Sequence, residues 1–389
     1  MSVIYKRIIS ITLILCMSFM TVVFAQPSTQ VDTDVSTQLV KAESGILMEA
    51  STGDVLYEWN PDQKLQIASV TKTMTLLLIM EALDSGKINL TDTVTTSENA
   101  ASMGGSQVFL EIGEQMSVDD MLKAIAVSSG NDAAVAMAEH LGGTHEAFVE
   151  MMNERASALG CSNTHFINCT GLDETTDHYS SARDIAKISQ ELLKHEKIFD
   201  YTTIWMDTLR DGTFGLSNTN KLIRFYNGAN GLKTGSTSTA KYCLSATAKR
   251  DNMQLIAVVL GAPTTGERFS SASSLLDYGF ANYSVVNESQ LNIDFPTITV
   301  HGGTESSVET LGNDISFIVK KGNGSKVETE ILSEPFVKAP IDANEKLGEI
   351  VFKIDGTEVT RRDLVAKTDV PQIGLFKTFL KLINLWMTA

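Results

Sequence analysis

The spacing of hydrophobic residues changes period along the chain, and these changes predict which segments form strands and which form helices. Residues 44–58 have the pattern of two strands around a turn at residues 51–53. Helical spacing follows in five segments, at residues 69–84, 117–127, 131–140, 146–159 and 182–194. Residues 161–178 show little periodicity and are predicted to form a loop.

Strand periodicity returns after residue 235. Residues 242–248 and 255–260 predict adjacent strands, and residues 268–278 predict a helix. Residues 41–285 therefore have strands at both ends and helices between them, which predicts an α+β fold. We expect an antiparallel sheet assembled from the two ends of this segment, with a helical cluster on one side.

The C-terminal part of the chain has a different pattern. Short β-patterned segments between Gly and Asn turns predict a small all-β domain over residues 290–368. Residues 371–389 are mainly apolar, with Lys377 and Lys381 on one helical face. They predict an interfacial amphipathic helix that anchors the protein on a membrane surface, with Trp386 at headgroup level. The alternative is a helix packed on the β domain; the two lysines disfavour a membrane-spanning helix.

The N-terminal residues have the pattern of a secretory signal. A basic start at Lys6 and Arg7 precedes an apolar run, and Ala25 ends a small-residue cleavage site. Residues 1–25 are therefore predicted to be a signal peptide, which predicts export, and the polar residues 26–40 to be a linker. The alternative is an uncleaved membrane helix, because the apolar run is nearly long enough to span a bilayer.

Composition narrows the function classes. Of the 389 residues, 43% are hydrophobic, which is enough for a buried core. The formal net charge of −16 argues against nucleic acid as a partner. No Cys or His cluster has zinc-ligand spacing, so the sequence predicts no metal site and no cofactor. Cys161, Cys169 and Cys243 are too few for a disulfide framework; a Cys161–Cys169 disulfide and buried thiols both remain open.

Candidate chemistry lies where the first long helix begins. Ser69 and Lys72 are three residues apart, so a helix places them on one face. A serine is a weak nucleophile until a base takes its proton, and a lysine with a lowered pKa can be that base. The spacing alone is a weak signal, because Ser238 and Lys241 share it. Most such pairs are a capping serine and a solvated lysine.

Two further motifs strengthen the hypothesis. The sequence Ser129-Gly130-Asn131 lies in the break between two predicted helices, and Lys233-Thr234-Gly235 opens the first late strand. Ser-x-Asn is common, but Lys-Thr-Gly occurs once. The ordered set Ser-x-x-Lys, Ser-x-Asn and Lys-Thr-Gly is typical of serine acyl-transfer enzymes of the penicillin-binding and β-lactamase type.

Each residue type suits one part of an acyl transfer. Ser69 attacks a carbonyl carbon and becomes acylated, while Lys72 takes its proton. A nearby Lys233 cation is expected to keep Lys72 neutral. Ser129, bonded to Lys233, is expected to relay a proton to the leaving amine. Asn131 is expected to hold Lys72 and the substrate amide through its amide donors.

The backbone around these motifs has expected roles as well. The N–H groups of Ser69 and Ser236 are predicted to form an oxyanion hole. Gly235 has no side chain, so we expect a substrate strand to approach the edge of its strand closely.

These motifs and the order of the segments make the chain similar to the D-alanyl-D-alanine carboxypeptidases, which are low-molecular-mass penicillin-binding proteins. The resemblance covers the signal peptide, a penicillin-binding serine peptidase domain at residues 41–285, the β domain and the C-terminal anchor. It implies a β-lactamase/transpeptidase-like fold and removal of the terminal D-alanine from peptidoglycan stem pentapeptides. It also implies β-lactam antibiotics as covalent inhibitors, a role in cell-wall biogenesis and cell shape, and a location on the outer face of the cytoplasmic membrane.

The resemblance also implies substrate-binding residues. Residues 177–184, 218–222 and 231–235 are similar to family stretches. Arg268 matches the family position that, with Thr234, receives the terminal carboxylate of the substrate. An arginine suits this role because its planar group binds a carboxylate through two hydrogen bonds. From the residues alone, a surface helix cap remains open for Arg268.

The chain departs from the family pattern at one position. Lys233, Thr234, Gly235 and Ser236 are predicted to contact the substrate, but some members carry His where this chain has Ser236. Substrate preference is therefore open. Residues 241–250 are similar to the sporulation-associated members.

Three alternative functions are weighed against the sequence: a class A β-lactamase, a DD-endopeptidase and a non-catalytic wall-binding protein. Glu288-Ser289-Gln290-Leu291-Asn292 matches a class A β-lactamase motif, but follows Lys-Thr-Gly where that family has it before, so we interpret it as coincidence. A DD-endopeptidase acting on cross-linked muropeptides would need the same catalytic residues. A non-catalytic wall-binding protein is disfavoured because all the catalytic residues are present.

Overall fold

The computed structural model describes residues 39–172, 175–313, 315–321 and 327–374, together with Phe379, Ile383, Trp386 and Met387. The predicted signal peptide, most of the predicted linker and most of the predicted C-terminal helix therefore lie outside the described residues. Within the described part of the chain, no helix is long and apolar enough to cross a membrane.

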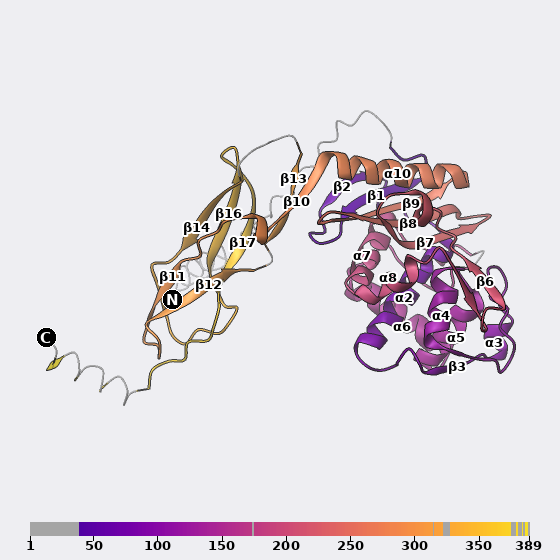
Figure 1. Ribbon diagram of the computed structural model, residues 1–389, viewed down its shortest axis with the longest axis horizontal. Coiled ribbons are helices and arrows are strands. Elements are labelled where there is room, and N and C mark those ends of the chain that lie inside the picture. Colours follow the sequence, from indigo (N-terminus) through magenta and orange to yellow (C-terminus); the bar gives the residue numbers. More distant parts are fainter. Residues whose placement is uncertain are drawn as a thin grey trace, which may run out of the picture. The chain divides into compact units, whose positions relative to one another are not determined.

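The N-terminal domain is built on one antiparallel sheet with the strand order β2-β1-β9-β8-β7 (Figure 1). Its strands are Ser44–Glu49 (β1), Val55–Trp59 (β2), Ala229–Thr237 (β7), Lys241–Arg250 (β8) and Met253–Ala262 (β9). Because β1 pairs with β9, strands from the two ends of the domain are neighbours. The predicted α+β fold is confirmed, and β7, which carries Lys233, lies at an edge of the sheet.

Helices occupy the chain between the two groups of strands and directly after them. They are Ala68–Thr71 (η1), Lys72–Asp84 (α2), Glu98–Ala101 (α3), Val118–Ala126 (α4), Asn131–Gly142 (α5), His145–Ala158 (α6), Ala182–Leu193 (α7), Glu196–Ile198 (η2), Phe199–Thr202 (α8), Leu222–Phe225 (α9) and Thr265–Asn282 (α10). The six predicted helices are confirmed. The last begins earlier than predicted, because Thr264 caps it by accepting a hydrogen bond from the N–H of Glu267.

Two short two-stranded sheets were not predicted. Their strands are Thr93–Thr95 (β3) with Gln115–Ser117 (β4), and Met206–Leu209 (β5) with Phe214–Ser217 (β6). Strands of three or four residues carry too few alternating positions to give a periodic signal.

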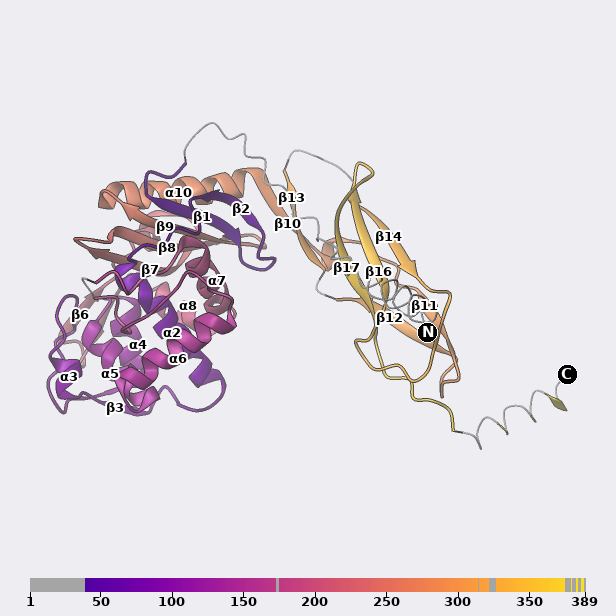
Figure 2. The ribbon, with the colours of Figure 1, turned by 180° about the vertical axis from the view of Figure 1, so that it is seen from behind.

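The main sheet is buried on both faces. Side chains of β1 alternate between them: Ile46 and Met48 pack into the helical core, whereas Leu47 packs with Leu275 of α10. Figure 2 shows α10 over one face of the sheet and α2 and α7 on the other. Double burial explains why β9 reads as a continuous apolar run rather than as an alternating strand.

The C-terminal part is all-β, as predicted. Its elements are Tyr283–Asn287 (β10), Glu288–Gln290 (η3), Thr297–His301 (β11), Ser307–Gly312 (β12), Ser316–Lys320 (β13), Val327–Ser333 (β14), Phe336–Lys338 (β15), Lys346–Ile354 (β16) and Thr357–Ala366 (β17). The larger sheet has the order β14-β16-β17-β12-β11-β15, and β10 pairs with β13. Phe352 and Leu364 are fully buried in its core.

Candidate active site

Ser69 lies in η1, immediately before α2. The prediction that it occupies the first turn of an α-helix is wrong, because residues 68–71 form a 3₁₀ turn. Ala68 before it has a φ of 46°, a left-handed conformation that is strained for alanine. Gly171 packs against this turn so closely that a Cβ atom there would lie 1.9 Å from the carbonyl oxygen of Ala68. The turn leaves Ser69 partly exposed, whereas Lys72 is fully buried.

The amine of Lys72 contacts three oxygen atoms. Its Nζ lies 3.1 Å from Oγ of Ser69, 2.5 Å from Oδ1 of Asn131 and 2.9 Å from the carbonyl oxygen of Thr170. These partners come from η1, from the start of α5 and from the loop after α6. The predicted contact of Lys72 with Ser69 and Asn131 is therefore present, although Asn131 accepts through its oxygen rather than donating.

This geometry suits a neutral amine. Two of the three oxygens, those of Asn131 and Thr170, can only accept hydrogen bonds. A neutral amine has two hydrogens for them and one lone pair. In that state the lone pair faces the hydroxyl of Ser69, which is the arrangement that a base needs to receive the Ser69 proton.

Burial gives Lys72 the pKa that a base at neutral pH requires. Desolvation of its fully buried side chain lowers the Lys72 pKa to about 7, against smaller opposing effects from Cys169 and Asp132. Burial is therefore the largest cause of the lowered Lys72 pKa, and the expected help from the Lys233 cation stays a prediction. The pKa of Lys233 is also lowered, by burial first and then by repulsion from Lys72 and Arg268.

The expected hydrogen bond between Ser129 and Lys233 is absent from the contacts of the described residues. The Lys233 amine donates instead to the carbonyl oxygen of Thr234, at 3.0 Å. Ser129 is almost fully buried and has a φ of 64°, so its backbone is strained between α4 and α5. A proton relay through Ser129 remains a prediction.

A loop before α4 holds Asn131 in position. The side-chain amide of Asn131 donates to the carbonyl oxygen of Gly104 at 2.7 Å, and its backbone N–H donates to the carbonyl oxygen of Ser106 at 2.7 Å. The next residue, Asp132, is buried and accepts from the N–H groups of Val108 and Leu110. The amide oxygen of Asn131 is thereby directed to Lys72.

The structure shows why position 235 requires a glycine, which the sequence did not indicate. A Cβ atom at this position would lie 2.7 Å from the carbonyl oxygen of Ile67 and 2.8 Å from the backbone nitrogens of Ser69 and Val70. The glycine is thus required by the contact between β7 and η1. This contact brings the backbone of Ser236, the next residue, towards Ser69; their oxyanion hole stays a prediction.

Of the predicted carboxylate-binding residues, Thr234 belongs to β7 and Arg268 belongs to α10. Thr234 donates through Oγ1 to Oγ1 of Thr219 at 2.7 Å. Arg268 is not a surface helix cap, because only 6% of it is exposed. Its Nη1 donates to the carbonyl oxygens of Gly235 and Cys243 at 3.3 and 3.4 Å, and its buried Nε has no hydrogen-bond partner among the described residues.

Sequence reasoning missed the role of residues 168–171. The side chain of Asn168 accepts hydrogen bonds from the backbone N–H groups of Thr170 and Gly171 at 3.0 and 2.6 Å. This Asx-type turn presents the carbonyl oxygen of Thr170 to Lys72. An asparagine two residues before a Thr-Gly pair is a turn signal that the sequence contains. That signal does not indicate that the turn contacts Lys72, which is distant in the sequence.

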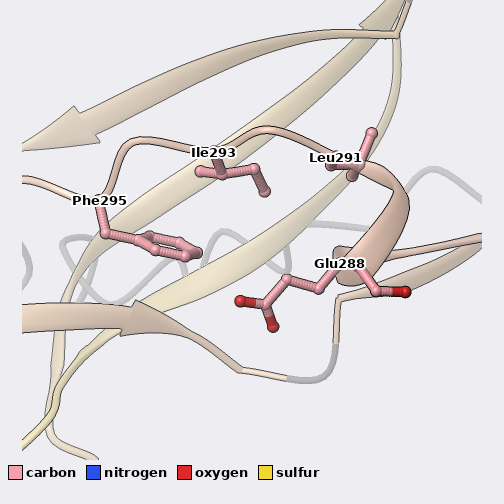
Figure 3. A pocket seen from close by; sticks show the side chains of 5 residues that line it. Glu288, Leu291, Ile293 and Phe295 are labelled. Atoms are coloured by element: carbon pink, nitrogen blue, oxygen red, sulfur yellow. The ribbon is translucent and has the colours of Figure 1, made fainter.

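Glu288 belongs to the C-terminal β domain. It begins η3 and lines a pocket there with Leu291, Ile293 and Phe295 (Figure 3). The described hydrogen-bond partners of Lys72 are a hydroxyl and two carbonyl oxygens, with no carboxylate. Glu288 is therefore no counterpart of the glutamate that activates water in class A β-lactamases.

The three cysteines of the described chain are free thiols, and all are buried. Cys169 is close enough to Lys72 for the two groups to interact electrostatically, and burial raises the pKa of its thiol to about 12. Among the described residues, no group of three or more His, Cys, Asp or Glu side chains could hold a metal ion.

Known proteins are similar to this chain in sequence and in fold. The chain matches the family model of D-alanyl-D-alanine carboxypeptidase over residues 31–264 and that of penicillin-binding protein 5, C-terminal domain, over residues 291–372. It is 48% identical, over 346 residues and 88% of each chain, to D-alanyl-D-alanine carboxypeptidase DacF of Bacillus subtilis (strain 168).

Solved structures agree with these matches. Penicillin-binding protein 5 from Haemophilus influenzae is similar with a TM-score of 0.78 and 33% identity, over 87% of this chain and all of that one. Penicillin-binding protein D2 from Listeria monocytogenes, in its ampicillin-bound form, is similar with a TM-score of 0.58 and 30% identity, over 63% of this chain and 99% of that one.

The fold and the serine–lysine pair define a serine acyl-transfer enzyme of the penicillin-binding class. With the matched sequence models, they show that the chain belongs to the D-alanyl-D-alanine carboxypeptidase family.

Proposed function

We propose that this protein removes the terminal D-alanine from peptidoglycan stem pentapeptides through an acyl-enzyme on Ser69. The observation that carries the proposal is the environment of Lys72. A buried amine with a pKa of about 7 lies 3.1 Å from the Ser69 hydroxyl and is held by two acceptor oxygens. Family membership supplies the substrate class.

The first step is acylation. Lys72 takes the proton of the Ser69 hydroxyl as Oγ bonds to the carbonyl carbon of the penultimate D-alanine. The N–H groups of Ser69 and Ser236 stabilise the oxyanion that forms. The bond to the terminal D-alanine then breaks, and the proton passes through Ser129 to the leaving amine.

The second step is hydrolysis of the ester. A water molecule gives a proton to Lys72 and attacks the acyl carbon, and Ser69 leaves with that proton restored.

Thr234 and Arg268 are assigned to the terminal carboxylate of the incoming substrate, because Arg268 is a buried cation beside the strand that carries Thr234.

A pentapeptide assay tests this function. Protein lacking residues 1–25 is incubated with a labelled stem pentapeptide, and free D-alanine is measured. We expect release by the wild type and none by Ser69→Ala. Release of D-alanine by Ser69→Ala at the wild-type rate would contradict the proposal.

A DD-endopeptidase is the second candidate, because it needs the same site and differs only in the leaving group. Cross-linked muropeptides offered beside the pentapeptide separate the two. We expect D-alanine release to exceed cleavage of the cross-link.

A β-lactamase is disfavoured by the absence of a carboxylate from the described hydrogen-bond partners of Lys72. Without such a base, penicillin is expected to acylate Ser69 and leave slowly, as a covalent inhibitor. Rapid catalytic hydrolysis of penicillin would reverse this ranking.

Export and membrane attachment are part of the proposal. The predicted signal peptide supports export to the cell-wall space. Phe379, Ile383, Trp386 and Met387 follow helical spacing and are all exposed, which supports an apolar face that binds a membrane surface. Removing residues 371–389 is expected to release the protein from lipid vesicles without changing penicillin labelling. Equal vesicle binding by the full and shortened chains would contradict the anchor.

A further inference from the structure

A pocket with a volume of about 380 Å³ lies between the segment that leads to η1 and the turn that follows β7. Its walls include Glu43, Lys64, Gln66, Tyr179, Thr239 and Ala240. None of these residues has a part in the acyl transfer described above. These residues are therefore available for a separate binding role.

Two segments of the pocket wall lead to the neighbourhood of Ser69. Gln66 is three residues before Ser69, and Cys243 binds its carbonyl oxygen through Sγ. Thr239 and Ala240 belong to the turn that follows β7, the strand that packs on Ser69. A ligand that leaves Ser69 along β7 towards this turn reaches the pocket.

The direction of the substrate follows from the proposed function. If Thr234 receives the terminal carboxylate, the leaving D-alanine lies at the start of the Lys-Thr-Gly motif. The acyl part must then run the other way, past Ser236 and Thr237, which lie on the edge strand β7. An extended peptide pairs readily with such an edge. Its residue before the penultimate D-alanine comes next to the pocket.

The pocket carries charges of both signs. The Lys64 amine lies over the ring of Tyr179, 4.7 Å from its centre, and none of the ion pairs between described residues includes it. Glu43 is held by Lys241, whose Nζ lies 2.6 Å from its Oε1. Lys64 is thus a positioned cation free to take a carboxylate, and Glu43 offers its other oxygen to an ammonium group.

The walls of the pocket are fixed rather than loose. Leu65 and Ser180 exchange backbone hydrogen bonds of 2.8 and 3.0 Å, which join the Lys64 segment to the Tyr179 segment. Gln66 also donates to the carbonyl oxygen of Thr175. The backbone N–H of Glu43 donates to the carbonyl oxygen of Leu260 at 3.1 Å. The backbone that carries each charged group is therefore held in place, as selective binding requires.

We propose that this pocket binds the side chain of the stem-peptide residue before D-alanyl-D-alanine, and that it selects a side chain ending in both an ammonium and a carboxylate group. Lys64 binds the carboxylate, and Glu43 binds the ammonium group. The inference rests on the proposed function for the direction of the peptide. It makes Lys64 a specificity residue and not a part of the acyl transfer.

Two matched peptides test the inference. Both end in D-alanyl-D-alanine; one carries 2,6-diaminopimelate at the preceding position and the other carries lysine, which lacks the carboxylate. The readouts are kcat/KM for D-alanine release and the slowing by each peptide of fluorescent-penicillin labelling of Ser69. We expect the wild type to prefer the diaminopimelate peptide by about tenfold, the usual value of one charge-assisted hydrogen bond.

Variants separate charge from structure. Lys64→Met is expected to remove the preference while leaving labelling by penicillin alone unchanged, and Lys64→Arg is expected to keep it. Lys249→Met removes the same charge at the other end of β8 and is expected to keep the preference as well. Equal use of both peptides by the wild type, or a preference that survives Lys64→Met, overturns the inference.

Failure of the proposed function gives a different result. If no peptide releases D-alanine, the carboxypeptidase assignment is wrong, and the labelling competition still reports which peptide binds. A preference for the diaminopimelate peptide in that competition, lost in Lys64→Met, supports the proposed role of the pocket. No preference in the wild type overturns the inference.

Discussion

The amine nitrogen of Lys72 lies 2.9 Å from the carbonyl oxygen of Thr170, although the two residues are almost a hundred positions apart in the sequence. Thr170 belongs to a loop with little hydrophobic periodicity. This loop completes the environment of the base, because it supplies one of the two acceptors that fix the hydrogens of a neutral Lys72. A segment without regular structure is thus part of the catalytic arrangement.

The first prediction concerns Asn168, whose side chain shapes this loop. Asn168→Ala removes the acceptor for the N–H groups of Thr170 and Gly171, so the Thr170 carbonyl loses its fixed direction. We expect the rate of Ser69 acylation by fluorescent penicillin to fall by about tenfold. Asn163→Ala, on the same loop, is the control and should keep the wild-type rate. A wild-type rate in Asn168→Ala would show that the turn has no part in positioning Lys72.

The second prediction concerns the chemical identity of the base. Lys72→Arg keeps a positive charge, but a guanidinium group does not give up its proton at neutral pH. The acylation rate should therefore fall by about 10²- to 10⁴-fold, the range of a lost general base. Lys187→Arg, on the distant surface of α7, serves as the control. If Lys72→Arg acylates as fast as the wild type, another group takes the proton.

The third prediction is a pH profile. Burial lowers the pKa of Lys72 to about 7, and only the neutral amine can accept the Ser69 proton. Acylation should therefore be slow below pH 6, rise through pH 7 and level off above pH 8. Stopped-flow labelling from pH 5 to pH 9 measures it. A rate that falls as pH rises through 7 would mean that the protonated amine is the active form.

The fourth prediction tests the carboxylate site. Arg268→Gln removes a buried cation beside Thr234 and Gly235. We expect kcat/KM for a peptide ending in a free carboxylate to fall by about a hundredfold, because charged hydrogen bonds are the strong ones. The same peptide with a C-terminal amide serves as the matched substrate and should lose little. Equal losses on both substrates would indicate a structural role for Arg268.

Local patterns predicted much of the architecture, because each element carries its own signal. The apolar run after Ser69 forms α2, and the strands from both ends form one sheet. The three motifs also meet at one site, since Asn131 contacts Lys72 and β7 packs on Ser69.

Other features depend on distant contacts that no local pattern contains. The pKa of Lys72 is lowered chiefly by the depth of its burial, which the motif itself does not reveal. The close packing of β7 on η1, which Gly235 permits, likewise depends on a contact between residues that are distant in the sequence.

Mass spectrometry of the penicillin-treated protein tests the central claim most directly. The account predicts a mass increase of one penicillin molecule, located on the peptide that contains Ser69, and no increase in Ser69→Ala. Lys72→Arg should show the same adduct, formed far more slowly. An adduct on any other residue, or one that persists in Ser69→Ala, would contradict the assignment of Ser69 as the nucleophile.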